Sequence, residues 1–241
     1  MLTPNPVGGY SFVRGGGPYS SGVIADAGFT FEHIRLSRPL EWRDGFEYID
    51  AHLRNAGRPR AALCSIALRA PKPFTFEGFA EFNRGYIQVL RSMEMMVDGI
   101  NPIARTNVAP EVGPPAVPSL YSFAYTVPGS RTGPCFAVAG AGEISEGSPG
   151  EVVRPGDTSP EGMAEKARFV MGLLEARMKS LGVSWNDVTD TNVYTVHGLR
   201  ALLPTEILPR MGDAAVHGLT WHYSRPPIDA LDFEMDVRGG C

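Results

Sequence analysis

The sequence predicts an α+β protein of two similar units, each a mixed β-sheet with two helices packed on one face. First, the order strand, helix, strand, helix, strand, strand occurs twice along the 241 residues. Second, the 28 Gly and 21 Pro gather in clusters between apolar runs, which is typical of a chain of many short elements rather than a disordered one. We expect a first unit over residues 1–128, a linker over 129–134 and a second unit over 135–241.

The first half of the chain shows a helix with clear end signals. Residues 44–56 carry Phe46, Ile49 and Leu53 at helical spacing, and Gly57 stands where a left-handed cap would end the helix. A second apolar stripe predicts another helix over residues 76–91. Extended or β-rich runs lie around these helices, which predicts strands over residues 29–36, 60–70 and 119–127 and a short extended segment that opens at Arg105.

The second half contains the clearest single element of the sequence. Ser159 is a favoured helix cap, Pro160 suits the first helical position, and Gly182 suits the end, so a helix is expected between them. A shorter helix is expected over residues 199–210, where two prolines limit its length. The strands of this half are expected over residues 135–141, 188–197, 219–224 and 230–237.

Composition narrows the class of protein. The net charge is −4 and no basic run is interleaved with aromatic residues, so a nucleic-acid partner is not expected. The stretch 61–68 is too short to span a bilayer, and the N-terminus lacks the pattern of a signal peptide. Cys64, Cys135 and Cys241 are widely spaced, which predicts neither a disulfide framework nor a zinc site. We therefore expect a soluble cytoplasmic protein without a membrane partner.

Arg105 is the first candidate for chemistry. It follows the turn at Asn101 and Pro102 and stands at the lip of a short strand. A guanidinium there presents a planar, always charged fork that suits bidentate capture of a carboxylate. The alternative is an ordinary arginine in a structural ion pair.

The five histidines do not form a metal motif. There is no HExxH and no acid at ligand spacing, so no metal and no cofactor are expected. His197 and His222 stay open as acids or bases of a site in the second half.

Short motifs in the first half resemble the RidA/YjgF family of imine/enamine deaminases, whose fold is chorismate-mutase-like. The matching segments are Gly17-Pro18-Tyr19-Ser20, Phe79-Ala80-Glu81-Phe82-Asn83 with Tyr86, and Ala104-Arg105-Thr106. In the second half, Val138-Ala139-Gly140-Ala141-Gly142-Glu143-Ile144 and Asp232-Phe233-Glu234-Met235 are similar to two strands of the family. The order of these motifs carries the resemblance, which covers most of the chain as a tandem of two units.

The resemblance implies a cofactor-free site at the seam between units. Arg105 would clamp the substrate carboxylate, Tyr19, Asn83 and Thr106 would bind substrate beside it, and Glu234 would be the catalytic acid that orients water. The first half has no acid over residues 119–127, and the second half has Gly218 or a neighbour in place of the arginine. Either the two halves complete one site, or the role of the acid has passed to another group, or the function has changed.

The expected reaction is hydrolytic deamination of a 2-amino-enoate or 2-imino carboxylate, with an aminomuconate-type ring-cleavage product as one candidate. Such a substrate needs its carboxylate held and a water oriented by a carboxylate. The alternatives are a chorismate-type hydrolase on the same fold and a non-catalytic member that binds a small acid. The family also implies a homo-oligomer, with a trimer favoured, although the two halves could instead pair within one chain.

Overall fold

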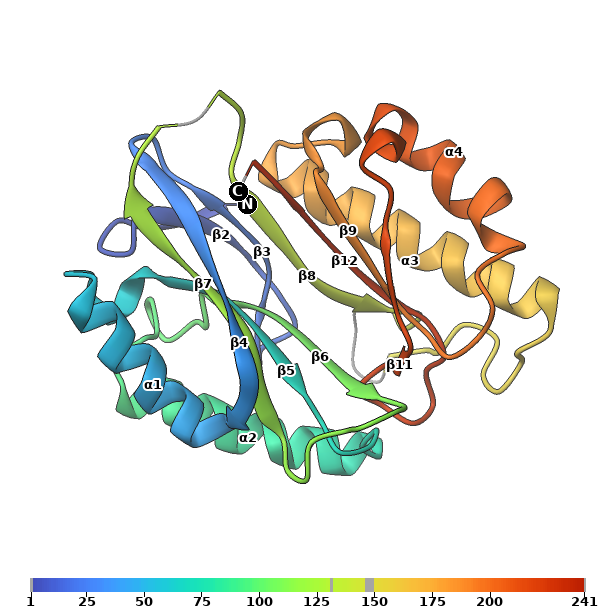
Figure 1. Ribbon diagram of the computed structural model, residues 1–241, viewed down its shortest axis with the longest axis horizontal. Helices are drawn as coiled ribbons and strands as arrows, with labels where there is room; N and C mark the ends of the chain where they lie inside the picture. Colours follow the sequence, from blue (N-terminus) through green and yellow to red (C-terminus); the bar gives the residue numbers. More distant parts are fainter. Residues whose placement is uncertain (1, 131, 146–149, 241) are drawn as a thin grey trace.

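The computed structural model describes residues 2–130, 132–145 and 150–240, and its twelve strands form one curled sheet with helices on its outside (Figure 1). The strand order along the main path is β10-β9-β12-β8-β3-β6-β5-β7-β4. At one end of the chain, β1 (Leu2–Asn5) pairs with β2 (Tyr10–Arg14), and β2 pairs with β3 (Ser20–Ala25).

Two groups of four strands repeat the same topology. In the first, the order is β4-β7-β5-β6, and only β5 and β6 run parallel. In the second, the order is β8-β12-β9-β10, and only β9 and β10 run parallel. The expected α+β fold of two units is therefore confirmed. The strand bounds are β4 (Phe29–Glu41), β5 (Leu63–Arg69), β6 (Ala104–Pro110), β7 (Ser119–Pro128), β8 (Phe136–Gly142), β9 (Asp190–Tyr194), β10 (Thr220–His222) and β12 (Glu234–Gly239).

Helices cover the outer face of each group. On the first, α1 (Trp42–Asn55) and α2 (Phe76–Ser92) bury Ile49, Leu53 and Leu90 against the sheet. On the second lie α3 (Pro160–Leu181) and a series of short helical segments, which Figure 1 shows on the opposite side of the molecule. These segments are a π-helical turn (Leu203–Ile207), α4 (Leu208–Met211) and a 3-10 turn (Gly212–His217). Two further 3-10 turns are Arg60–Ala62 and Trp185–Asp187.

The predicted ends of α3 are confirmed, because capping interactions of nearby residues determine them. The Ser159 hydroxyl accepts the Gly162 amide at 3.1 Å, and Gly182 closes α3 with a φ of 78°. The helix expected over residues 199–210 is broken into short pieces, because Pro204 and Pro209 each lack an amide hydrogen.

Three features differ from expectation. The glycine-rich start contains β1 and β2, whose Tyr10 and Phe12 are buried at 0% exposure. Strand β4 is 13 residues long, because it continues its pairing with β7 as far as Glu41. Cys135 is disulfide-bonded, which the wide spacing of the cysteines did not indicate, whereas Cys64 is free and buried.

Strand β3 joins the two groups within one chain. It pairs with β8 through Gly22 and Val138 and meets the start of β6 through Ser20 and Ala104. Beyond that point β6 and β8 remain neighbours, but the described residues show no hydrogen-bonded ladder between them. Side chains from both groups meet where these strands separate. The two halves therefore pair within one chain.

No helix among the described residues is long and apolar enough to cross a membrane.

Candidate functional site

Arg105 is buried at the start of β6 in a box of aromatic rings. Only 3% of the residue is exposed, and its side chain points toward α2. The guanidinium carbon lies 4.6 Å from the ring centre of Tyr86 and 5.5 to 5.8 Å from three further rings, those of Phe79, Tyr19 and Phe82. Such distances allow cation–π attraction, which holds the guanidinium in place without neutralising its charge.

The Arg105 guanidinium has unused hydrogen-bonding capacity. Its Nη2 donates to Oδ1 of Asn83 at 2.6 Å, whereas its buried Nη1 has no hydrogen-bond partner. Within the described part of the chain, no carboxylate lies within ion-pair distance of it. Burial lowers the pKa of Arg105. A buried cation with a free donor and no anion is suited to bind the carboxylate of a ligand.

Glu234 supplies an acid from the second group of strands. It opens β12 and is 3% exposed, between Phe233 and Met235, which pack into the core beneath α3. Burial raises the pKa of Glu234 well above its ordinary value, and the nearby carboxyl groups of Asp236 and Glu143 raise it further. Glu234 therefore holds its proton to a higher pH than an exposed glutamate does.

Arg105 and Glu234 line the same small cavity of about 60 Å³. The arginine comes from the first half of the chain and the acid from the second, so the structure brings the two incomplete residue sets together. The cavity lies between β6 and β8, and its wall is otherwise mainly apolar. The lining residues are Tyr19, Phe79, Arg105, Asn107, Gly140, Gly142, Ile144, Pro227, Ile228, Leu231 and Glu234.

Asn107 is a polar residue of this cavity that the motifs did not indicate. It is 4% exposed, and neither its amide nitrogen nor its amide oxygen has a hydrogen-bond partner. It lies two residues beyond Arg105 in β6, so both side chains are on the same face of the strand. That alternation was the available sequence signal. A buried amide with both groups unpaired is suited to recognise a ligand.

A larger cavity of about 620 Å³ adjoins the small one. The two share Tyr19, Gly140, Gly142, Ile144 and Ile228. Its charged lining residues are Arg14 and Arg177. Nη1 of Arg177 donates to the carbonyl oxygens of Ala139 and Gly140 at 2.9 and 3.1 Å, which fixes the end of β8. Among the described residues, the inner chamber is lined by one cation and one acid, and the outer chamber by Arg14 and Arg177.

The remaining expected site residues lie in different places. Tyr19 lines both chambers. Asn83 lies behind Arg105 and orients it rather than lining either chamber. Thr106 points away from Arg105, as its neighbouring position in a strand requires, and its hydroxyl donates to Oδ2 of Asp236 at 2.7 Å. Thr106 therefore forms a contact between the two halves of the chain. It does not line either chamber.

The two histidines that the sequence left open do not line either chamber. His222 stacks on Tyr194 with ring centres 4.7 Å apart, and His197 has its Nε2 3.4 Å from Oδ1 of Asp232. Across residues 2–130, 132–145 and 150–240, no three His, Cys, Asp or Glu side chains are grouped to hold a metal ion.

Comparisons with known proteins connect this site to a reaction class. The family described as 2-aminomuconate deaminase CnbZ matches residues 2–240. The chain is 40% identical over 237 residues to a 2-amino-5-chloromuconate deaminase of Comamonas testosteroni, covering 96% of this chain and 94% of that protein. These matches confirm the deaminase resemblance that the sequence motifs indicated.

Solved structures give the likeness in fold. A chorismatase matches with a TM-score of 0.55 and 13% identity, over 91% of this chain and 77% of its own. The YjgF gene product of E. coli matches with a TM-score of 0.31 and 16% identity, over 46% of this chain and 84% of its own.

Proposed function

Because the chain belongs to the 2-aminomuconate deaminase CnbZ family, we propose that it is a cofactor-free hydrolase that releases ammonia from a 2-aminomuconate-type enamine. The observation that carries this proposal is the meeting of Arg105 and Glu234, from the two halves of the chain, in the wall of one small chamber. The identity to a named deaminase favours this reaction over the chorismate-type alternative.

Arg105 binds the carboxylate next to the amino-bearing carbon. Its free Nη1 donates to one carboxylate oxygen, while Asn83 keeps Nη2 and the plane of the guanidinium in place. The aromatic box excludes water from the rest of the group, so the charge–charge attraction is stronger than it would be in solvent. The inner chamber, at about 60 Å³, suits the reacting end of a substrate and a water molecule rather than a whole six-carbon chain.

Glu234 transfers the protons. In its protonated form it donates a proton to the enamine carbon, and the carbon–nitrogen bond becomes that of a protonated imine. The resulting carboxylate then takes a proton from water as the water oxygen bonds to the imine carbon. Glu234 then returns that proton to nitrogen, and its carboxylate takes the hydroxyl proton as the carbon–nitrogen bond breaks. The products are ammonia and a 2-oxo acid, one water is consumed, and Glu234 is again protonated. A carboxyl group whose pKa is raised by burial fits both roles.

The outer chamber receives the rest of the substrate. Its volume of about 620 Å³ accommodates an extended dicarboxylate, and the lining cation Arg14 suits a second carboxylate. Asn107 contacts the amino group or the attacking water, because both its donor and its acceptor are unused.

The boundary between the two units, the cellular compartment and the oligomeric state are also proposals. We infer a unit boundary at residues 129–134, since β7 ends at Pro128 and β8 begins at Phe136. We also infer a cytoplasmic homo-oligomer, with a trimer favoured.

The test is ammonia release from 2-aminomuconate by the wild type and by Arg105→Ala and Glu234→Gln. We expect each variant to lose on the order of 10²-fold or more in kcat/KM, since each removes a group that acts in the transition state. Arg91→Ala and Glu77→Gln change exposed residues of α2 and serve as matched controls. Full activity in Glu234→Gln would remove the acid from the mechanism, and no release by the wild type would reject the reaction itself.

A further inference from the structure

Arg69 is a second buried arginine without a carboxylate partner. It ends β5, is 6% exposed, and donates through Nη1 to the carbonyl oxygen of Leu68 at 3.0 Å. Among the residues that the structure describes, no Asp or Glu oxygen lies within 4.0 Å of its guanidinium. Arg69 thus has the property that makes Arg105 a carboxylate clamp. Burial of a charge without a counter-ion costs folding free energy, and a bound anion would reduce that cost.

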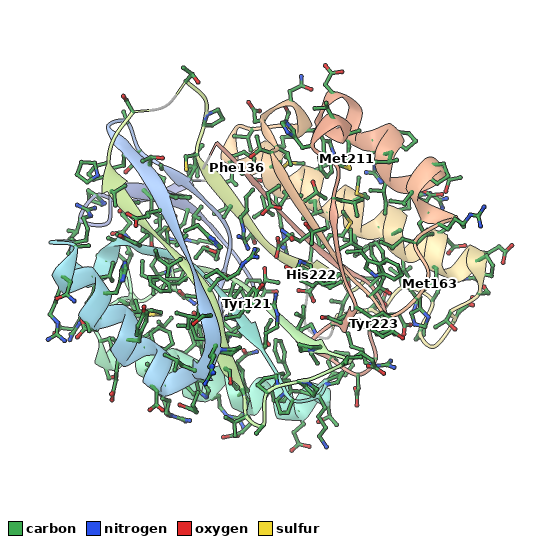
Figure 2. All side chains as sticks on the ribbon, in the orientation of Figure 1. Tyr121, Phe136, Met163, Met211, His222 and Tyr223 are labelled. Atoms are coloured by element: carbon green, nitrogen blue, oxygen red, sulfur yellow. The ribbon has the colours of Figure 1, made fainter. Side chains whose placement is uncertain are left out.

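Tyrosine rings hold Arg69 where the two halves of the chain face each other. Its guanidinium carbon lies 4.0 Å from the ring centre of Tyr121 and 5.7 Å from that of Tyr194. Arg35 also lies over the Tyr121 ring, at 5.6 Å, and has no carboxylate partner in the described chain. Figure 2 places Tyr121 at the centre of the molecule. Two guanidinium groups close to one ring repel each other, and a bound anion would relieve that repulsion.

A cavity of about 460 Å³ opens beside Arg69 and Tyr121. The proline-rich segment that follows β6 forms much of its wall, so the wall is largely apolar. The acid that lines it, Glu41, is engaged elsewhere, because its Oε2 accepts the amides of Arg43 and Asp44 at 2.7 and 3.2 Å and caps α1. Apart from this helix-capping carboxylate, the cavity therefore combines one buried cation with largely apolar walls, in the size range of small-molecule sites.

This cavity is separate from the two chambers of the deaminase site. Arg105 pairs with Ile66 and Arg69 pairs with Val108 in the ladder between β5 and β6. Directly paired residues lie on the same face, and Ile66 and Arg69 are three positions apart, so Arg69 and Arg105 point to opposite faces of the sheet. The cavity beside Arg69 shares no lining residue with either chamber.

We propose that the Arg69 cavity binds a small organic carboxylate with an apolar body. The carboxylate lies on the Arg69 guanidinium, and the body packs against the proline-rich wall near Ala116. This ligand site is additional to the deaminase site and does not depend on the proposed reaction.

Calorimetric titration with benzoate tests the proposal, because benzoate carries one carboxylate on a flat apolar body. Three proteins are compared: the wild type, Arg69→Met and Arg105→Met. We expect binding in the wild type and a loss of at least about tenfold in the affinity of this cavity in Arg69→Met. Arg105→Met should remove only benzoate bound at the deaminase site and change the affinity of this cavity by less than about twofold. A melting temperature for each variant shows that it is folded.

A second pair of variants tests the cavity itself without touching buried residues. Ala116→Trp, on the exposed wall, fills the cavity and should also abolish benzoate binding. Val112→Trp is the matched control, because Val112 is 78% exposed in the same segment and does not line the cavity. The proposal fails if the wild type binds no benzoate, if Arg69→Met or Ala116→Trp binds it normally, or if Arg105→Met alone loses it.

Discussion

Asn83 accepts a hydrogen bond of 2.6 Å from Nη2 of Arg105, and this contact decides which face of the guanidinium is left for a ligand. Asn83 lies on α2 and Arg105 on β6, so the helix sets the orientation of the guanidinium that we propose to bind the substrate carboxylate. Replacement of Asn83 by alanine leaves the charge of Arg105 in place but removes the hydrogen bond that orients its guanidinium. A clamp that is present but misaligned weakens substrate binding more than it weakens proton transfer.

We therefore expect Asn83→Ala to raise KM for 2-aminomuconate by about tenfold, with a smaller change in kcat. Steady-state ammonia release measures both quantities. Gln88→Ala is the matched control, since Gln88 is an exposed amide on the same helix. An equal fall in kcat with an unchanged KM would show that Asn83 acts on the reaction step instead.

Asn107→Leu should separate activity from stability. Both polar atoms of Asn107 are buried and unpaired, so their removal should leave the free energy of unfolding unchanged or raise it by about 1 kcal/mol. Activity should fall by about tenfold or more if the amide contacts substrate. In contrast, Asn192 bonds to Asp236 at 3.0 Å and to His222 at 2.9 Å, so Asn192→Leu should cost about 1–3 kcal/mol. Urea unfolding measures the stability of Asn107→Leu and Asn192→Leu, and ammonia release measures their activity.

Gly140→Ala should disable the inner chamber without unfolding the protein. A Cβ atom at Gly140 would lie 2.2 Å from Oε1 of Glu234, so the acid would have to move. The backbone at Gly140 does not need a positive φ, and alanine itself is not strained there. We expect a loss of about 10²-fold in kcat with a cost of about 1–3 kcal/mol in stability. Gly198→Ala, which meets no atom within 4 Å, should leave both quantities unchanged.

Local signals in the sequence predicted much of the fold. Ser159 and Gly182 act through atoms of their own helix ends, so α3 has the expected bounds. The strands β1 and β2 were missed because glycines surround them, and their Tyr10 and Phe12 become a strand core only when β3 pairs with them.

The candidate site was predicted only in part, because its assembly depends on contacts between residues that are far apart in the sequence. Arg105 and Glu234 belong to motifs, whereas their meeting in one chamber depends on contacts between residues 129 positions apart. The alternation of side chains along β6 would have indicated Asn107 in place of Thr106. No local pattern reveals that the Thr106 hydroxyl donates to Asp236, which lies 130 positions away.

The pH dependence of kcat/KM should reflect the protonation of Glu234. Burial and two neighbouring carboxyl groups raise the pKa of Glu234, and the proposed first step needs its protonated form. We expect kcat/KM to fall as pH rises through that raised pKa, and we expect Glu234→Gln to lack this decline in its residual rate. A pH–rate profile of both proteins tests this. The same decline in both would assign it to another group.

Glu234 should also make stability depend on pH. Its folded-state pKa lies above the unfolded value of about 4.3, so the folded protein holds the proton more tightly. Its contribution to stability is then full below that unfolded value and is lost as pH rises through the folded pKa. Glu234→Gln should therefore gain stability relative to the wild type as pH rises, in urea unfolding at acidic and alkaline pH.

The ion pair behind the site should be essential to the fold. Lys166 and Glu143 both have fully buried side chains, with 3.4 Å between Nζ and Oε1, and Lys166 also bonds to Asp232. Glu143 accepts the amides of Asp232 and Phe233, which lead directly into Glu234. Lys166→Met leaves the Glu143 carboxylate without its cation, so we expect a loss of about 3–5 kcal/mol in unfolding free energy.

The double variant Lys166→Met/Glu143→Gln decides the cause of that loss. It removes the charges of Lys166 and Glu143 and keeps an amide oxygen that can accept one of the two backbone amides, but Asp232 still lacks its lysine, so part of the stability should return. Lys179→Met, on an exposed position of α3, should change little. If the double variant is no more stable than Lys166→Met, the uncompensated charge of Glu143 does not account for the loss, which then comes from the packing of the lysine stem or from its pair with Asp232.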